Sequence, residues 1–223
     1  MGEAAIEARA QDGQTRRRLQ SRRRLLAAAR ELFVTRGYDR TRPQDIARAA
    51  GVASGTFYLH FRDKEDVFLA FAAEAQDDLF AYSRERLGPV HGVSARFRAF
   101  IGAMFTYAEL HPGVLQAAFL DPVMIAPGDE EAWRLYDRFG RSVAAALAEA
   151  AGQGAIADDY HLPLISHALG GLIRHGTLFG RRSGLDPEQV ADQLTRFISR
   201  GLGAPDGALA SGTTTSDGET AHE

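Results

Sequence analysis

The sequence predicts an all-α protein of about nine helices, and three observations support this fold class. Apolar residues recur at helical spacing along most of the chain, as in the early run Leu25, Leu26, Ala29, Leu32 and Phe33. Glycine and proline separate these runs and give each a definite end. The alternating pattern of a β-strand persists in no segment. With 223 residues, the chain is long enough for one large domain or two smaller ones.

Composition excludes several classes of function. The chain has no cysteine, which excludes disulfides, thiolate metal sites and cysteine nucleophiles. No apolar run approaches the ~20 residues that a membrane span needs. The charged N-terminus has no apolar stretch of the kind found in signal peptides. We therefore expect a cytoplasmic protein without a membrane partner.

The charge of the chain is unevenly distributed. Its formal net charge is −3, yet residues 15–50 contain 11 arginines against three acids. That segment therefore carries +8 and the remainder −11. This basic segment, residues 15–50, is called the basic head. A basic head joined to an acidic remainder suggests an anionic partner for the basic head alone. A solvated arginine-rich tail is the alternative.

The N-terminal third divides into a polar arm and short helices. Residues 1–21 lack apolar periodicity, and we expect a disordered basic arm there. From Arg22 a helix runs to Gly37, and a glycine suits the left-handed position after a helix end. Thr41, followed three residues later by Gln44, predicts a capping box that starts a second, short helix with a proline in its first turn.

Two further helices complete this region. Gly51 ends the second helix, and a third is expected over residues 54–61. Asp63 then caps a fourth helix over residues 64–87, which a Gly-Pro pair stops. We expect residues 22–70 to form one small domain.

A longer helical region follows in residues 71–202. Its expected helices cover residues 94–111, 113–123, 129–151, 158–179 and 186–202. Residues 203–223 consist mainly of glycine, serine, threonine and acidic residues, and we expect a disordered tail there.

The second and third helices are short and joined by a glycine-containing turn, which is typical of a helix-turn-helix. In that motif the second helix enters the major groove of DNA. Phe57 and Phe61 would anchor this recognition helix on the helices before it. Thr56, Tyr58 and His60 would face the DNA, where their polar groups can reach phosphates and base edges.

Lys64 begins the fourth helix, where its charge and the helix N-terminus together suit a phosphate. Several of these residues also have a plainer interpretation. Tyr58 can be a half-buried surface aromatic, and His60 can cap the third helix. Arg48 is better interpreted as a solvated helix charge than as a DNA contact.

Five short motifs follow one another closely between about Arg22 and Phe71. They are Thr41, then DIA at 45–47, AGV at 50–52, GTFYLHF at 55–61 and KED at 64–66. Together they resemble the N-terminal domain of TetR/AcrR-type transcriptional regulators. The resemblance implies a three-helix helix-turn-helix domain, joined by the fourth helix to a helical ligand-binding and dimerisation domain.

The resemblance also implies a homodimeric repressor that binds a palindromic operator and is released by a small, largely apolar effector. The DNA contacts expected from the helix faces and the resemblance are Thr41, Arg42, Gln44, Ser54, Gly55, Thr56, Tyr58, His60 and Lys64. Among these, Arg42, Gln44 and Thr56 are the candidates for reading bases. The chain departs from the family at Ala53, where a serine usually caps the recognition helix. Ser54 can take that role one residue later, which leaves the start of this helix open.

Aromatic and polar residues of the second region are candidates for the effector pocket. They are Phe100, Met104, Tyr107, Gln116, Phe119, Trp133, Tyr136, His167 and His175. Each aromatic residue is also readable as plain core, because pockets are built from core-like residues with a few polar ones. His175 is also readable as a satisfied interface histidine. The histidines have no further ligands at metal-binding spacing, so we expect no metal and no cofactor.

Glycines within residues 158–179 point to close helix packing. A glycine inside a helix costs ~1 kcal/mol relative to alanine, and a close helix contact can compensate for it. We predict that this helix and the last one pair across a homodimer, through Leu169, Leu172, Ile173, Gly176, Leu194, Phe197 and Ile198. Packing within one chain is the alternative.

Two other classes of function remain open. The chain has no G-x-S-x-G, H-E-x-x-H, P-loop or G-x-G-x-x-G motif, so nothing favours an enzyme. A ligand-binding dimer without DNA binding is the other class. The basic head and the intact recognition face argue against it.

Overall fold

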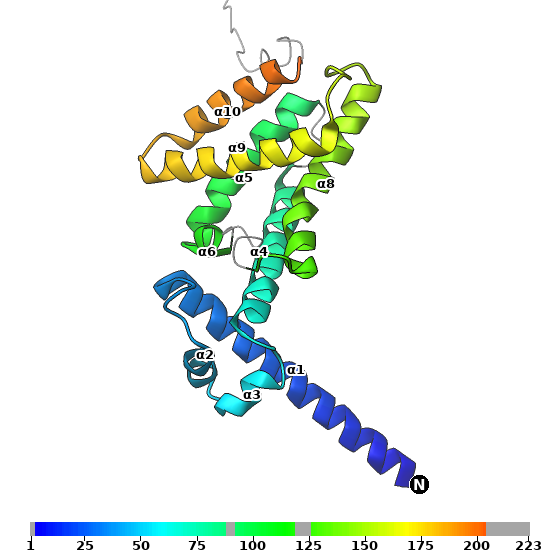
Figure 1. The fold of residues 1–223 in the computed structure, drawn as a ribbon, viewed down its shortest axis with the longest axis vertical. Coiled ribbons are helices and arrows are strands. Elements are labelled where there is room, and N and C mark those ends of the chain that lie inside the picture. Colours follow the sequence, from blue (N-terminus) through cyan, green and yellow to red (C-terminus); the bar gives the residue numbers. More distant parts are fainter. Residues whose placement is uncertain (1–2, 88–91, 119–125, 204–223) are drawn as a thin grey trace, which may run out of the picture. The chain divides into compact units, whose positions relative to one another are not determined.

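The described residues of the computed structural model, 3–87, 92–118 and 126–203, form nine helices and no strand. Side chains are described from residue 13 onward. This confirms the prediction of an all-α fold (Figure 1). The expected tail from residue 204 onward and the end of the helix expected over 113–123 lie outside the described residues.

The helices group into two compact units, each built from separate stretches of the chain, and the expected domain boundary at residue 70 stays a prediction. The first unit contains Met1–Tyr82 and Thr106–Arg138, and the second contains Ser83–Phe105 and Phe139–Glu223. The first unit includes a middle stretch of the chain because the short helix α6 (Val114–Ala118) packs against α1. Gly113, just before α6, is so close to α1 that an added Cβ would lie 2.7 Å from Cγ1 of Val34. A middle segment of the chain therefore belongs with the N-terminal helices.

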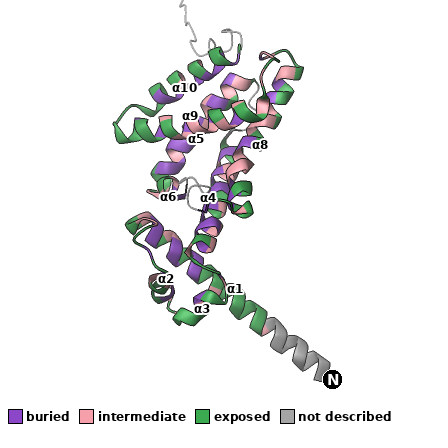
Figure 2. Cartoon of the chain, viewed as in Figure 1, coloured by how far each residue is buried: buried purple, intermediate pink, exposed green. Residues whose placement is uncertain are grey.

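Helix α1 (Glu3–Arg36) continues through most of the segment expected to be a disordered arm. The reason is local: apart from Gly13, residues 3–24 are largely alanine, glutamate, arginine, glutamine and leucine, which are strong helix formers. Helix propagation from a packed end is far easier than nucleation of an isolated helix. The packed end is visible in Figure 2, where buried residues lie toward the C-terminal half of α1. As predicted, the helix ends at Gly37, which has a φ of 84°.

Aromatic side chains form the core of the first unit beneath α1. Phe33 of α1 packs edge-on against Phe68 of α4 (Lys64–Leu87), with ring centroids 5.6 Å apart. Tyr38 packs edge-on against the same Phe68 at 5.1 Å. Ile46 of α2 and Phe57 of α3 are also fully buried. Helix α2 packs against both α1 and α3.

Helix α2 (Pro43–Ala49) and helix α3 (Ser54–Tyr58) are joined by a turn at Gly51, which has a φ of 64°. The expected capping box at the start of α2 is not formed. Arg42 occupies the N-cap position without a side-chain cap bond, while the Thr41 hydroxyl donates to the Gly37 carbonyl at 2.8 Å. Thr41 is buried, with 1% exposed, so its hydroxyl bonds to a carbonyl inside the protein rather than to the start of α2.

The second unit contains α9 (Leu162–Arg182) and α10 (Pro187–Gly201), together with parts of α5 (Val93–Leu110) and α8 (Glu130–Gly152). Helices α9 and α10 lie side by side (Figure 1). Asp186 caps α10, since its carboxylate accepts the Gln189 N–H at 3.0 Å.

Glycines permit close side-chain packing within this unit. A Cβ at Gly176 of α9 would lie 2.8 Å from a methyl carbon of Leu194 on α10. A Cβ at Gly140 of α8 would lie 2.4 Å from the ring of His167 on α9. These contacts are made within one chain and compensate for the weak helix propensity of glycine.

Candidate DNA-binding face

Helix α3 has one buried and one exposed side. Phe57 is fully buried and Phe61, just past the helix, is 2% exposed, so both anchor α3 as expected. On the other side Tyr58 is 53% and Leu59 71% exposed. Gly55 is also exposed. Positions one and two after a buried helix residue face away from it, which turns Tyr58 and Leu59 outward.

The helix begins at Ser54, with Ala53 at the N-cap position and no side-chain cap bond. This settles the start of the helix that Ala53 had left open. Ser54 is exposed, and its hydroxyl is therefore on the surface beside Gly55. Thr56 and His60 are only half-buried, so they reach the surface less fully than Tyr58.

His60 is linked to α1 rather than to the end of its own helix. Its Nε2 lies 2.7 Å from the Ser21 hydroxyl. Burial, and next the positive charges of Arg18 and Arg22, hold the pKa of His60 below its usual value of 6.5. A neutral imidazole at the end of the recognition helix is the result at neutral pH.

This shift predicts a pH dependence of stability. The unfolded chain has a His60 pKa near 6.5, above the folded value, so as the pH falls it binds more protons than the folded chain. The free energy of unfolding should be fully retained above about pH 6.5 and fall at lower pH. Urea unfolding of wild type and His60→Gln at pH 7.5 and about pH 5.5 measures this. An equal loss in both proteins on acidification would exclude a contribution from His60.

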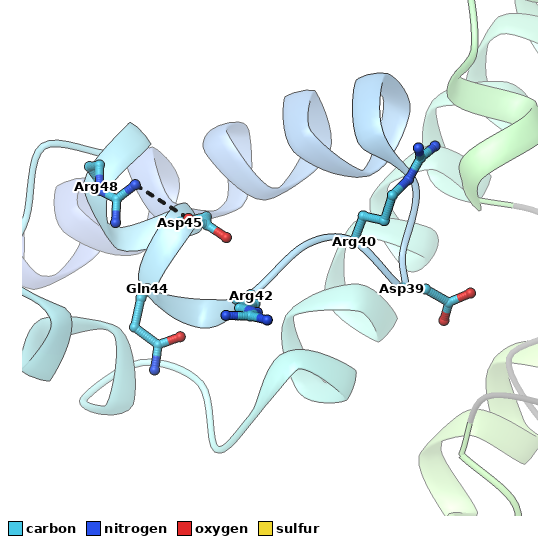
Figure 3. A pocket seen from close by; sticks show the side chains of 6 residues that line it. All are labelled: Asp39, Arg40, Arg42, Gln44, Asp45 and Arg48. Carbon is cyan, nitrogen blue, oxygen red and sulfur yellow. Dashed lines mark hydrogen bonds and ion pairs between the residues drawn. The ribbon is translucent and has the colours of Figure 1, made fainter.

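The start of α2 borders an open depression with a volume of about 710 Å³ (Figure 3). Its lining consists of Asp39, Arg40, Arg42, Gln44, Asp45 and Arg48. Arg42 and Gln44 are exposed, as expected of DNA contacts. Arg48 Nη1 lies 3.4 Å from the Asp45 carboxylate but keeps 80% of its side chain exposed. Three arginines against two aspartates leave this surface net positive.

Two of the expected phosphate contacts interact with other residues of the chain. Thr41 is buried and its hydroxyl is bonded to the Gly37 carbonyl, so it cannot donate to a phosphate in this conformation. The Lys64 ammonium donates to the Tyr38 carbonyl at 3.2 Å and lies 3.9 Å from the centre of the Tyr38 ring. An ammonium carries three donors, so Lys64 retains capacity for a phosphate.

The phenol of Tyr38 stays neutral beside this lysine. Burial raises the pKa of Tyr38 to about 12, with smaller contributions from the nearby Glu65, Asp63 and Asp39. The Lys64 ammonium therefore lies against the face of a neutral phenol ring and a carbonyl, and Tyr38 fixes its position.

The structure adds surface residues that the sequence analysis did not select. Leu59 is more exposed than Tyr58, at 71% against 53%, and an apolar side chain there suits a thymine methyl group. Arg40 and Arg48 line the depression at α2. The signal for Leu59 was present: it lies midway between the buried Phe57 and Phe61, so it must point outward.

The candidates for an effector pocket divide between the units. Phe100, Met104, His167 and His175 belong to the second unit, while Tyr107, Gln116, Trp133 and Tyr136 belong to the first. Met104 and Tyr107 are buried, whereas Trp133 is 53% exposed. Gln116 and His175 are exposed as well. Phe119 lies outside the described residues.

The candidates for a dimer interface also differ in exposure. Leu169, Ile173 and Ile198 are buried inside the second unit, and Gly176 packs on Leu194 of the same chain. Leu172 is half-buried. Phe197 is 68% exposed, and Phe179 of α9 is 66% exposed.

The described residues contain neither a metal site nor a membrane-spanning helix. No group of three or more histidine or acidic side chains there is arranged to hold a metal ion. None of the helices described combines the length and apolar character of a membrane span.

Comparison with known sequences supports the helix-turn-helix. Residues 25–71 match the family model described as bacterial regulatory proteins, tetR family. The fatty acid metabolism regulator protein of Bacillus subtilis (strain 168) is 39% identical over 94 residues, covering 36% of this chain and 47% of that protein. The chain thus spans about half the length of this curated relative.

Solved structures share the fold over most of the chain. The fatty acid degradation regulator FadR from Bacillus halodurans has a TM-score of 0.65 at 18% identity, covering 79% of this chain and 93% of its own. FadR from Bacillus subtilis in complex with stearoyl-CoA also has a TM-score of 0.65 at 18% identity, covering 80% and 98%. A bacterial regulatory protein in the tetR family from Rhodococcus RHA1 has a TM-score of 0.61 at 19% identity, covering 83% and 98%. At these identities the likeness is one of fold.

Proposed function

Because the chain belongs, through its residues 25–71, to the tetR family of bacterial regulatory proteins, we propose that it is a ligand-responsive transcriptional repressor. In this proposal it acts as a homodimer on a palindromic operator, and a largely apolar effector releases it. Its place of action is then the compartment of the DNA, the cytoplasm.

The exposed side of α3 is the observation that carries the proposal. A helix buried by two phenylalanines presents Gly55, Tyr58 and Leu59 to solvent. The small residue permits close approach to the DNA, the phenol can donate to a phosphate, and the leucine offers an apolar contact. The positive surface at the start of α2 lies in the same unit and suits the backbone beside the groove.

The exposed apolar side chains of α9 and α10 support a dimer. Phe179, Phe197 and Leu178 are exposed on these neighbouring helices, at 66%, 68% and 43%. Large exposed apolar groups on adjacent helices mark an interaction surface. A two-fold dimer places its two recognition helices in successive major grooves about 34 Å apart, which requires a palindromic operator.

The effector proposed here is apolar with at least one polar group. Tyr107 and Gln76 are buried polar side chains of the first unit, 1% and 7% exposed. The Gln76 side-chain oxygen has no hydrogen-bond partner among the described residues. Buried polar groups of this kind can orient an otherwise apolar ligand. A long-chain acyl thioester is the class to test first, since one protein of similar fold is in complex with stearoyl-CoA.

Release of DNA then follows from differential binding. An effector that binds only a conformation with the wrong spacing of recognition helices lowers operator affinity by its coupling free energy, typically about 1–3 kcal/mol. Helix α4 contributes residues to both units, and we take it to be the element that transmits the change.

Titration of stearoyl-CoA against the operator-bound protein tests this part of the proposal. We expect operator affinity to fall by about 5- to 150-fold at saturation. Free coenzyme A and stearate serve as separate controls for the two parts of the probe. Unchanged operator affinity with bound stearoyl-CoA would remove the acyl thioester as effector but leave the DNA-binding proposal standing.

An enzymatic function receives no support. The relatives named above are regulatory proteins. The alternative is a ligand-binding dimer that does not bind DNA. The affinity for random DNA, measured against salt concentration, distinguishes the two, because it falls steeply with salt when a protein contacts several phosphates.

A further inference from the structure

The N-terminal arm, defined as residues 13–24 of α1, carries a concentrated charge outside the helix-turn-helix. It contains six arginines and no acidic residue. All six are exposed: Arg16, Arg17, Arg18, Arg22, Arg23 and Arg24. Residues 14–20 are exposed throughout, and the first buried side chain along α1 is Leu25. The arm therefore does not serve the core.

The base of the arm is attached to both ends of α3. Ser21 hydrogen-bonds His60, just past the end of α3, at 2.7 Å. The Arg22 guanidinium lies 5.0 Å from the centre of the Phe61 ring. On the other side, Arg24 Nη2 donates to the carbonyl of Gly51, before α3, at 3.3 Å. Because α1 is continuous, the direction of the arm is fixed relative to the recognition helix.

The arm is long enough to reach DNA beyond the bases that α3 faces. Gly13 and Leu25 are twelve positions apart, a rise of about 18 Å along the helix. Duplex DNA carries about ten phosphates over that axial length. Arginines seven positions apart lie within about 20° of each other around the helix, which places Arg16 and Arg23 in one row along the arm.

The charge pattern of the arm calls for an anionic polymer. Like charges four positions apart, as at Arg18 and Arg22, destabilise an isolated helix. No acid within the arm offsets them. Phosphates would neutralise these charges, and guanidinium groups bind phosphates in bidentate geometry. Bound DNA would supply such a row of phosphates to the arm.

We propose that the arm binds the phosphate backbone of the operator outside the base pairs contacted by α3. This inference rests on the proposed function, since α3 must first bind DNA. The arm adds affinity without sequence preference, because phosphate contacts position a protein but do not read bases. It also lengthens the DNA segment that the protein covers.

The test compares full-length wild type with the triple variant Arg16→Gln, Arg17→Gln and Arg23→Gln. These positions spare the contacts that attach the arm to α3, and glutamine preserves helix propensity. The matched control is Arg84→Gln, Arg86→Gln and Arg141→Gln, which removes the same charge from exposed positions of the second unit. Circular dichroism checks that both variants stay folded.

The measurements are the slope of log Kd against log salt on the selected operator and the hydroxyl-radical footprint. One lost phosphate contact per chain of a dimer lowers the slope by about 2 and weakens binding about 30-fold at about 150 mM salt. Protection should shrink only at the outer edges of the footprint, and base preference should not change. The control should match wild type.

Two results would overturn the inference in different ways. If wild type and the arm variant bind the operator with the same slope and footprint, the arm does not contact DNA although the proposed function holds. If wild type selects no palindrome, the proposed function fails and the inference fails with it.

Discussion

Replacing Phe57 with alanine is expected to destabilise the first unit by about 3–5 kcal/mol and to abolish specific DNA binding. Phe57 is fully buried and packs at ring-centroid distances of 5.2 Å and 5.7 Å against Tyr58 and Phe61. Removing it leaves a cavity and takes away a buried anchor of α3, the helix that packs against α2. Urea unfolding gives the loss of stability, and binding to the selected operator gives the loss of function.

Tyr58→Ala is the matched control for this prediction. Tyr58 is the neighbouring aromatic residue of the same helix but is 53% exposed. We expect its removal to lower the free energy of unfolding by only about 0.5–1.5 kcal/mol, through the lost edge-on contact with Phe57. Operator affinity should nevertheless fall about 5- to 150-fold through the lost contact with DNA. If Tyr58→Ala lowered stability as much as Phe57→Ala, the assignment of the two sides of α3 would be wrong.

Replacing both Phe179 and Phe197 with glutamate is expected to split the dimer. The two side chains are 66% and 68% exposed in one chain. A dimer that covers them buries four aromatic side chains, each worth about 1.5–3 kcal/mol. The substitutions remove this contribution and place charges in the interface. We expect the dimer Kd to rise by at least about 10⁴-fold.

Sedimentation measures the oligomeric state, and operator binding should fall together with dimerisation, because one recognition helix alone reads only a half-site. Leu110→Glu provides the control, since Leu110 is 57% exposed but belongs to the first unit. If the variant with both substitutions remained a dimer, the dimer interface would have to lie elsewhere on the chain.

Much of the fold could be predicted because its helix ends are marked by local chemistry. Gly37 has the positive φ that a glycine after a helix tolerates, and Asp63 and Asp186 accept backbone N–H groups of the helices they cap. The two sides of α3 could be predicted as well, because the spacing of Phe57 and Phe61 determines which residues are buried.

Other features depend on contacts that sequence spacing does not reveal. The sequence at Thr41 matches a capping box, but burial of its side chain brings the hydroxyl to a carbonyl of the preceding turn instead. The ammonium of Lys64 is held by Tyr38, which lies 26 positions away. The arm looked disordered because it has no apolar face, yet strong helix formers continue α1 through it.

The grouping of the helices into compact units also depends on contacts that the sequence does not reveal. Apolar periodicity identifies a helix but not the helix it packs against. The close approach of Gly113 to Val34 joins a middle segment to α1, and neither residue signals that contact in the sequence. Likewise, the glycines of α9 indicated close packing correctly but did not specify that Gly176 meets Leu194 of the same chain.

The central claim is that the exposed side of α3 reads an operator, and selection from a genomic fragment library at about 150 mM salt tests it most directly. Wild type should enrich a palindrome with half-sites about 10 base pairs apart, centre to centre. A variant with Tyr58→Ala and Leu59→Ala, both at exposed positions, should lose that enrichment while remaining folded. Enrichment of no sequence by wild type, or of the same palindrome by both proteins, would contradict the claim.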